Sequence, residues 1–110
     1  MNANQKGKRG EREWRDQLRS AGYTARRGQQ FSGGSDSPDV ICDELSKVIH
    51  FEVKRVERLN IDQAIAQATK DGAGKAPVVA HRKNGQDWVV TLPATTFFKL
   101  LRGGVDELRK

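Results

Sequence analysis

The sequence predicts a mixed α/β fold, in which a β-sheet of about five strands is flanked by helices. Three observations lead to this prediction. Residues 7–21 show the apolar spacing of an amphipathic helix, residues 48–54 alternate as in a strand, and an Asn-Gly turn separates two further strand-like runs. A chain of 110 residues is large enough for a core of its own. We expect one domain over residues 1–110, with a flexible basic segment at 1–6 and a loose tail at 103–110.

The composition favours a soluble protein with a polyanionic partner. The single cysteine, Cys42, cannot form a disulfide within the chain, and we expect it in the core. No apolar run has the length of a signal peptide or a membrane span, so we expect a cytoplasmic protein without a membrane partner. The formal net charge is +6, and residues 1–27 carry a local excess of +5. This basic end favours nucleic acid, and a solvated surface helix is the alternative interpretation.

The first helix is predicted at residues 7–21, before Gly22. Trp14 and Leu18 form its core face, and Glu11 lies within about 60° of both. An inward carboxylate needs a basic group or a metal-bound water, unless it only stabilises the helix dipole from the first turn. A separate stripe offers a track for phosphates, with residues at spacings of four, three and four: Lys8, Arg12, Arg15 and Arg19.

A short strand is expected at 23–27, and a Gly/Ser-rich loop at 28–37. The loop either closes over a DNA backbone or is a plain connection. Pro38 begins the second strand and places Asp39 at its entrance, whereas the rival candidate Asp36 lies in the loop. The turn at 43–46 is expected to join this strand to 48–54 as an antiparallel hairpin.

The strand at 48–54 has one charged face and one core face. Glu52 and Lys54 are two residues apart and project from the same side, while Ile49, Phe51 and Val53 project from the other side. The hairpin arms have similar lengths, so the acid at position 39 comes near the charged face. Two carboxylates and an ammonium there form a suitable binding site for a divalent metal ion and the water that the ion activates.

The second half of the chain supplies a helix, a hairpin and a last helix. The helix at about 61–71 has Asn60 as its N-cap, and Gln67 lies at the edge of its apolar stripe. Gln67 either reaches the charged face or is an ordinary surface residue. Two strands, at 77–81 and 88–92, form a hairpin in which His81 is a strand residue rather than a ligand. The last helix, about 95–102, is expected to pack on the sheet.

Three groups of residues resemble a known nuclease family. Pro38-Asp39 followed by Glu52-Val53-Lys54 resembles the PD-(D/E)xK nuclease signature. The stretch KRGEREW at 8–14 resembles the helical start of archaeal-type Holliday-junction resolvases, and residues 67–101 resemble small phage and bacterial members of the same group. The likeness covers residues 6–102. It implies a restriction-endonuclease-like fold and a single nuclease domain.

The resemblance implies a metal-dependent DNA endonuclease that cuts branched DNA, such as Holliday junctions, in recombination and repair. Asp39, Glu52 and the carbonyl of Val53 would bind Mg²⁺, for which Mn²⁺ would substitute. Lys54 would orient or deprotonate the attacking water, and Glu11 would support the metal directly or through water. The catalytic residues implied in this way are Glu11, Asp39, Glu52, Lys54 and Gln67.

The family also implies its partners and location. We expect DNA as substrate, a twofold homodimer whose interface the last hairpin and Phe97 or Phe98 could supply, and the cytoplasm of a bacterial or phage-infected cell. Ser35 or Ser37 takes the place of the family's loop serine, or neither does. The alternative function is a non-enzymatic nucleic-acid-binding domain on the same fold. The residues expected to contact nucleic acid are Lys8, Arg9, Arg12, Arg15, Arg19, Arg26, Arg27, Ser35, Ser37 and Arg55.

Overall fold

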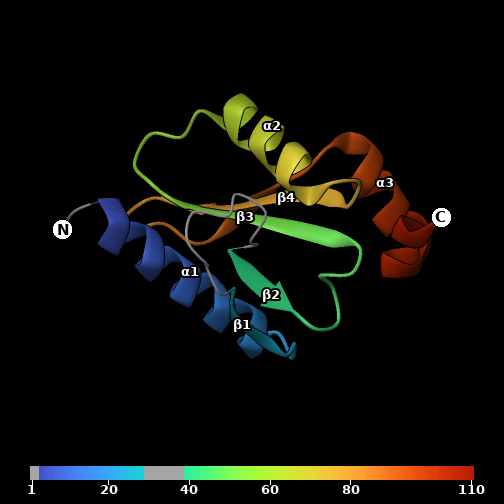
Figure 1. The fold of residues 1–110 in the computed structure, drawn as a ribbon, viewed down its shortest axis with the longest axis horizontal. Helices are drawn as coiled ribbons and strands as arrows, with labels where there is room; N and C mark the ends of the chain where they lie inside the picture. Colours follow the sequence, from blue (N-terminus) through green and yellow to red (C-terminus); the bar gives the residue numbers. More distant parts are fainter. Residues whose placement is uncertain (1–2, 29–38) are drawn as a thin grey trace.

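The computed structural model describes residues 3–28 and 39–110, and its elements follow the predicted order (Figure 1). The mixed α/β class with five strands is confirmed, and none of the described helices is both long enough and apolar enough to cross a bilayer. The elements are α1 (Ala3–Ser20), β1 (Ala25–Arg27), β2 (Val40–Cys42), β3 (Ile49–Arg55), α2 (Ile61–Gly72), β4 (Ala76–Arg82), β5 (Val89–Thr91), α3 (Ala94–Gly103) and the 3-10 helix η1 (Gly104–Arg109).

The larger sheet has three strands, in the order β3-β4-β5. Strands β3 and β4 are parallel, and α2 makes the crossover that parallel neighbours require. The Asn60 side chain accepts a hydrogen bond from the Gln63 backbone N–H, so it caps α2 as predicted. Strands β4 and β5 are antiparallel, and Gly85 has φ of +74° in the turn between them. The predicted Asn-Gly hairpin is therefore confirmed, because glycine adopts a positive φ without steric cost.

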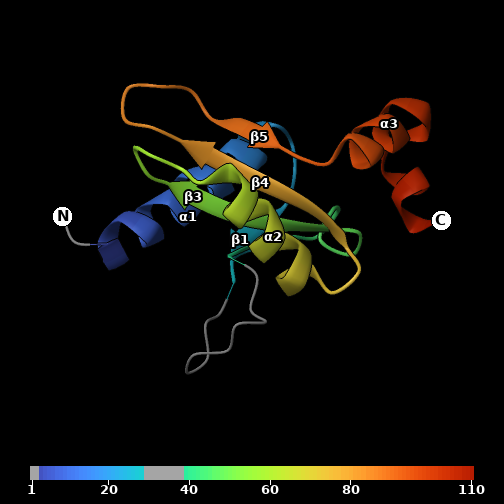
Figure 2. The same cartoon turned by 90° about the horizontal axis from the view of Figure 1, so that it is seen from above.

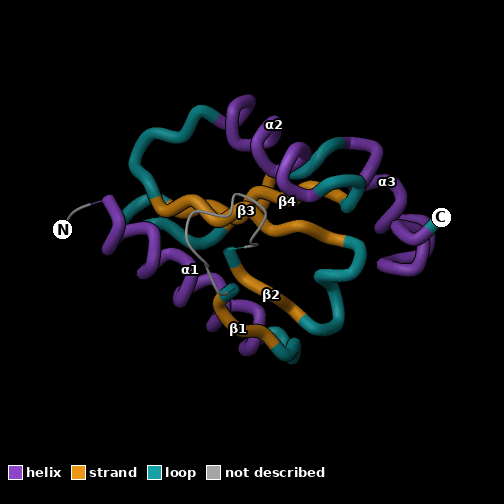
Figure 3. The backbone as a smooth tube through the Cα atoms, in the orientation of Figure 1, coloured by secondary structure: helices purple, strands orange, loops and turns teal. Residues whose placement is uncertain are grey.

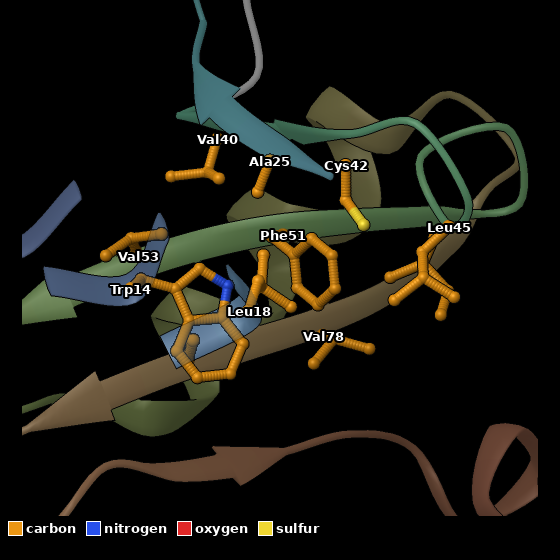
Figure 4. Close-up of a cluster of buried hydrophobic side chains, with 11 residues drawn as sticks. Trp14, Leu18, Ala25, Val40, Cys42, Leu45, Phe51, Val53 and Val78 are labelled. Carbon is orange, nitrogen blue, oxygen red and sulfur yellow. The ribbon is translucent and has the colours of Figure 1, made fainter. Parts of the chain in front are cut away.

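Helices cover both faces of β3, with α1 on one side and α2 on the other (Figures 1 and 2). Phe51 packs edge-on against Trp14 of α1, with ring centroids 5.7 Å apart. On the opposite face His50 lies against Gly72 at the end of α2. The charged face of β3 is thus covered as well, and both His50 and Glu52 are buried. Figure 4 shows the core on the α1 side, where side chains of α1, β2, β3 and β4 meet.

The predicted hairpin between the second and third strands is wrong. Strand β2 pairs antiparallel with β1, with Ala25 opposite Cys42, and the described residues contain no backbone ladder between β2 and β3. Figure 3 shows β1 and β2 as a separate pair beside β3. Residues 43–48 wind through successive turns because Leu45 is buried in the core and the Ser46 hydroxyl accepts from the Cys42 N–H at 2.8 Å. This winding replaces the tight turn of a hairpin. Cys42 is fully buried, as predicted.

Both predicted end segments contain helix. Helix α1 begins at Ala3, so residues 3–6, within the segment predicted to be flexible, are helical. At the other end, residues 104–109 form η1 rather than a loose tail. Val105 and Leu108 pack against the core, which the three-residue repeat of a 3-10 helix permits.

Helix α3 lies at one end of the molecule instead of packing on the sheet. Figure 2 shows α3 and η1 beyond the edge of the sheet, and the main contacts of α3 are with η1. Its side chains Phe97, Phe98 and Leu101 are exposed by 47%, 58% and 68%. An apolar face of this size is left for another surface to cover.

Helix α1 approaches β3 closely at Gly10. A Cβ atom at this position would lie 2.9 Å from the Cβ of Arg55, too close for both to stay in place. We expect Gly10→Ala to destabilise the protein by about 1–3 kcal/mol through overpacking. The matched control is Gly7→Ala in the same helix, where an added Cβ atom would meet no described neighbour within 4 Å. This variant should be more stable than wild type by about 0.5–1 kcal/mol. Urea unfolding of both variants is the measurement, and equal midpoints would contradict this contact.

Candidate active site

Asp39 closes the outer edge of β3. Strand β3 is the edge strand of its sheet, and the backbone N–H of Val53 donates to Asp39 Oδ2 at 2.8 Å. The N–H and C=O of one strand residue point to the same side of the strand. The carbonyl of Val53 therefore faces the side where the Asp39 carboxylate lies. The structure brings the predicted acid to the predicted strand, although a side chain and not a hairpin ladder makes the connection.

Glu52 and Lys54 share the α2 face of β3, as their spacing predicted. Lys54 Nζ lies 3.6 Å from Glu52 Oε1. The Glu52 side chain is 9% exposed and that of Lys54 is 37% exposed, so a buried carboxylate is paired with an ammonium that still reaches solvent. This pairing offsets part of the cost of burying the carboxylate.

The carboxyl of Asp39 is held in an unfavourable environment for its charge. Burial raises its pKa to about 6, and the negative charges of Glu52 and Glu11 act in the same direction. The Val53 N–H and the Lys54 ammonium oppose this rise. Neighbouring carboxylates with raised pKa values are typical of a site that a divalent cation neutralises.

Glu11 faces inward from α1, as predicted. Its side chain is 8% exposed, and its Oε2 lies 3.6 Å from an Arg27 guanidinium nitrogen. Burial raises the pKa of Glu11, and Arg27 opposes this rise. The helix dipole stabilises acidic side chains only in the first turn of a helix. Because α1 begins at Ala3, Glu11 lies beyond that turn and does not gain this stabilisation. Its Oε1 is buried with no hydrogen-bond partner among the described residues.

These oxygen atoms fit a hard divalent cation. Two carboxylates, from Asp39 and Glu52, and one backbone carbonyl are the ligands that Mg²⁺ and Mn²⁺ prefer. The unpartnered Oε1 of Glu11 is an additional acceptor near this group, because the charge of Glu11 acts on Asp39. The residues present therefore suit the cation that the sequence predicted.

Gln67 lies on the α2 side of the same site. It lines a cleft of about 360 Å³ together with Lys54, Arg58 and Gln63. Its side-chain amide donates to Asp71 Oδ2 at 2.8 Å, one helical turn further along α2. The structure places Gln67 in the cleft beside Lys54, and its catalytic role stays a prediction.

The predicted basic stripe runs along α1. Lys8 and Arg12 are exposed, whereas Arg15 is half-buried and pairs with Asp16. Arg19 donates to the Ala25 carbonyl at 2.9 Å and so ties α1 to β1. Beside the stripe lies an open groove of about 730 Å³ between α1 and the β4–β5 turn; basic residues on its walls are Arg9, Arg12, Arg15 and Arg82.

The remaining predicted DNA contacts divide into three groups. Arg26 forms an exposed ion pair with Asp43, and Arg27 is the partner of Glu11. Arg55 is the clear difference from prediction, because its side chain is 6% exposed and its Nε lies 3.0 Å from Glu13 Oε2. It lies under α1, on the core face of β3, and is not open to a ligand. Ser35, Ser37 and the rival acid Asp36 lie outside the described residues.

Two residues with a part in this region were not singled out from the sequence. His50 lies two positions before Glu52, so strand alternation alone could have placed it beside the acid. Glu13 binds Arg55 and Arg82, which extend from β3 and β4, and Arg9 on its own helix. No sequence spacing signals this cluster, because Arg82 is brought to Glu13 only by the parallel pairing of β3 and β4.

Comparison with known proteins identifies the family. The chain resembles the solved structure of Archaeoglobus fulgidus Hjc, described as a Holliday junction resolvase from an archaeal hyperthermophile, with a TM-score of 0.52 and 21% identity over 79% of this chain and 72% of that chain. At this identity the likeness shows the fold alone. No curated protein sequence matches the chain. The family model described as archaeal Holliday junction resolvase (Hjc) matches residues 2–100. The chain therefore belongs to the archaeal Holliday junction resolvase family, which the stretch KRGEREW at residues 8–14 resembles.

Proposed function

We propose that this protein is a Mg²⁺-dependent endonuclease that cleaves branched DNA such as Holliday junctions. The observation that carries the proposal is the position of Asp39, whose carboxylate is fixed on the edge of β3 beside Glu52 and Lys54. Membership of the resolvase family supports it. The related structure from A. fulgidus is itself described as a Holliday junction resolvase.

The roles proposed for the residues combine the family resemblance with their positions. Asp39, Glu52 and the Val53 carbonyl would hold Mg²⁺, with Mn²⁺ as a substitute. The bound cation would polarise the scissile phosphate and make a water molecule more acidic. The Val53 N–H keeps Asp39 in one orientation, so little reorganisation is needed when the substrate binds. The Lys54 ammonium would orient the attacking water and offset charge on the phosphate, and Glu11 would accept from water through Oε1.

The DNA backbone would follow the basic side of α1. Lys8 and Arg12 are exposed there, and the groove beside them is walled by further arginines. Each neutralised phosphate releases counterions, so binding should weaken as salt is added.

A homodimer would place two such sites on one four-way junction. The exposed apolar residues of α3, Phe97, Phe98 and Leu101, lie at the same end of the molecule as η1. The outer strand β5 adds Val89 and Val90, which are exposed by 51% and 48%. A twofold contact through one of these surfaces would cover apolar area that water now meets.

Cleavage of a synthetic four-way junction tests the proposal. With Mg²⁺ the protein should cut the junction faster than its separate duplex arms, and chelation should stop cleavage. Lys54→Ala should slow cleavage by about 10²–10⁴-fold, as loss of a group that positions water and charge does. Lys75→Ala, which removes an exposed lysine from the α2–β4 connection, is the matched control.

Two results would contradict the proposal. One is a folded protein that binds the junction without cutting it at any Mg²⁺ concentration, which would favour the non-enzymatic binding domain. The other is cleavage by Lys54→Ala at the wild-type rate.

A further inference from the structure

A second set of potential metal ligands lies on the α2 side of β3. His50, Glu52 and Asp71 each offer one ligand atom, and these atoms all lie within 4.8 Å of one another. Only Glu52 belongs to the proposed Mg²⁺ site. The other two residues have no part in the activity proposed above.

Two elements build this set. His50 and Glu52 share one face of β3 because they are two residues apart. Asp71 stands in the last turn of α2, next to Gly72, and a Cβ atom at Gly72 would lie 3.0 Å from the Cβ of His50. The small residue lets the end of α2 approach the strand, which brings Asp71 over the histidine. The Gln67 amide donates to Asp71 Oδ2 at 2.8 Å and orients this carboxylate.

The imidazole of His50 points into this set without a hydrogen bond. His50 is 5% exposed, and its Nε2 has no hydrogen-bond partner within the part of the chain that the structure describes. Glu52 Oε2 lies 3.5 Å from this nitrogen. A buried ring nitrogen left in this way costs free energy, and coordination of a cation would remove that cost.

The donors on the two sides of Glu52 differ in kind. Glu52 Oε1 lies toward the Lys54 ammonium, and Glu52 Oε2 lies toward the His50 imidazole. One imidazole nitrogen with two carboxylates suits Zn²⁺ and other first-row transition metals, whereas Mg²⁺ prefers oxygen alone.

We propose that His50, Glu52 and Asp71 bind a transition-metal ion such as Zn²⁺, and that this ion inhibits the enzyme. Inhibition follows because Glu52 serves both sites. A cation bound at Glu52 Oε2 would neutralise part of the negative charge that Glu52 offers to Mg²⁺. Two dications on the same carboxylate would also repel each other. Binding of Zn²⁺ stands on the geometry alone, and inhibition rests on the proposed nuclease activity.

Calorimetric titration of ZnCl₂ into the metal-free protein tests binding without any need for activity. Wild type should bind one Zn²⁺, and His50→Gln should lose at least tenfold in affinity. His81→Gln is the matched control, because His81 is the only other histidine of the chain and bonds to Thr91. It should bind Zn²⁺ as wild type does. The visible absorption of Co²⁺ added in place of Zn²⁺ should change in His50→Gln and not in His81→Gln.

A second variant guards against misfolding. Asp71→Asn replaces the anionic ligand at the half-buried end of α2 with a neutral amide of the same size. It should also weaken Zn²⁺ binding, with circular dichroism checking the fold. Equal affinity in wild type, His50→Gln and Asp71→Asn would overturn the site. Absence of Zn²⁺ binding in wild type would overturn it as well, and would leave His50 as a direct partner of Glu52.

The inhibitory part is tested by adding Zn²⁺ to cleavage reactions at fixed Mg²⁺. Zn²⁺ should slow wild type and His81→Gln at lower concentrations than it slows His50→Gln, by the same factor of at least ten. Equal inhibition of all three proteins would overturn this part. If no protein cleaves DNA under any condition, the proposed function fails while the calorimetric result for the site stands.

Discussion

Replacing Asp39 with Asn should strongly reduce Mg²⁺-dependent cleavage and, in the same protein, stabilise the metal-free fold at neutral pH. The amide oxygen of Asn can still accept from the Val53 N–H, so the edge contact of β3 is kept. The loss of one anionic ligand should lower cleavage by on the order of 10³-fold or more, as removal of a central catalytic group does. Junction cleavage at saturating Mg²⁺ measures this loss.

The gain in stability follows from the pKa of Asp39. Burial raises this pKa from 3.8 to about 6, so the folded protein holds a proton that the unfolded chain has released. The stability from protonated Asp39 is fully present below pH 3.8 and is lost as pH rises to about 6. Above that pH the ionised group costs up to about 3 kcal/mol, which Asn avoids.

Urea unfolding in the presence of a chelator measures this gain. The difference in the free energy of unfolding between Asp39→Asn and wild type should grow from pH 4 to pH 6 and then stay constant. Asp106→Asn is the control, because the Asp106 side chain is 85% exposed and should show no such trend. A wild type that is more stable than Asp39→Asn at pH 7.5 without metal would refute this account of the site.

Glu13→Ala should destabilise the protein by about 3 kcal/mol, far more than loss of a surface ion pair. Glu13 Oε2 lies 3.0 Å from Arg55 Nε, and Oε1 contacts Arg82. Removing the acid would leave Arg55, whose side chain is 6% exposed, as a buried charge without its partner. Burial acts to raise the pKa of Glu13, and the two arginines outweigh burial and lower it. The stability from this carboxylate is therefore present above pH 4.5 and is lost as pH falls below it.

A second change separates loss of the ion pair from loss of packing. In the Glu13→Ala background, Arg55→Met should recover part of the stability, because it removes the unpaired charge and keeps an apolar side chain. Asp16→Ala on the same helix should cost less than about 1 kcal/mol, since its partner Arg15 forms a surface pair. Thermal or urea unfolding measures all three. Equal losses for Glu13→Ala and Asp16→Ala would show that the cluster does not hold α1 to the sheet.

The local sequence was sufficient for most elements and for the charged strand. Asn84-Gly85 fixed the last hairpin, Asn60 fixed the start of α2, and alternation along β3 placed Glu52 and Lys54 on one face. Inward orientation of Glu11 followed from its angle to the apolar face of the helix. Each of these signals depends on residues close together in the chain, where backbone geometry fixes which side chains are neighbours.

Local sequence patterns could not predict the contacts between segments that are far apart in the chain. The partner of β2 proved to be β1 and not β3, and Arg55 proved to be buried under α1 although its charge suggested DNA. The end of the chain packs through Val105 and Leu108, which six residues in isolation could not indicate. In each case the contact depends on which apolar surfaces of the helices and strands are available for packing. This is decided only when these elements assemble.

By itself, the sequence determined the fold class, the order of the elements and the type of chemistry at β3, because periodicity and caps act within a few residues. Only the tertiary structure decided how Asp39 reaches Val53, that Glu13 gathers Arg55 and Arg82, and that His50 and Asp71 meet at Glu52. These contacts join residues from separate strands and helices. Their geometry is set by burial and by the parallel crossover through α2, which no local pattern specifies.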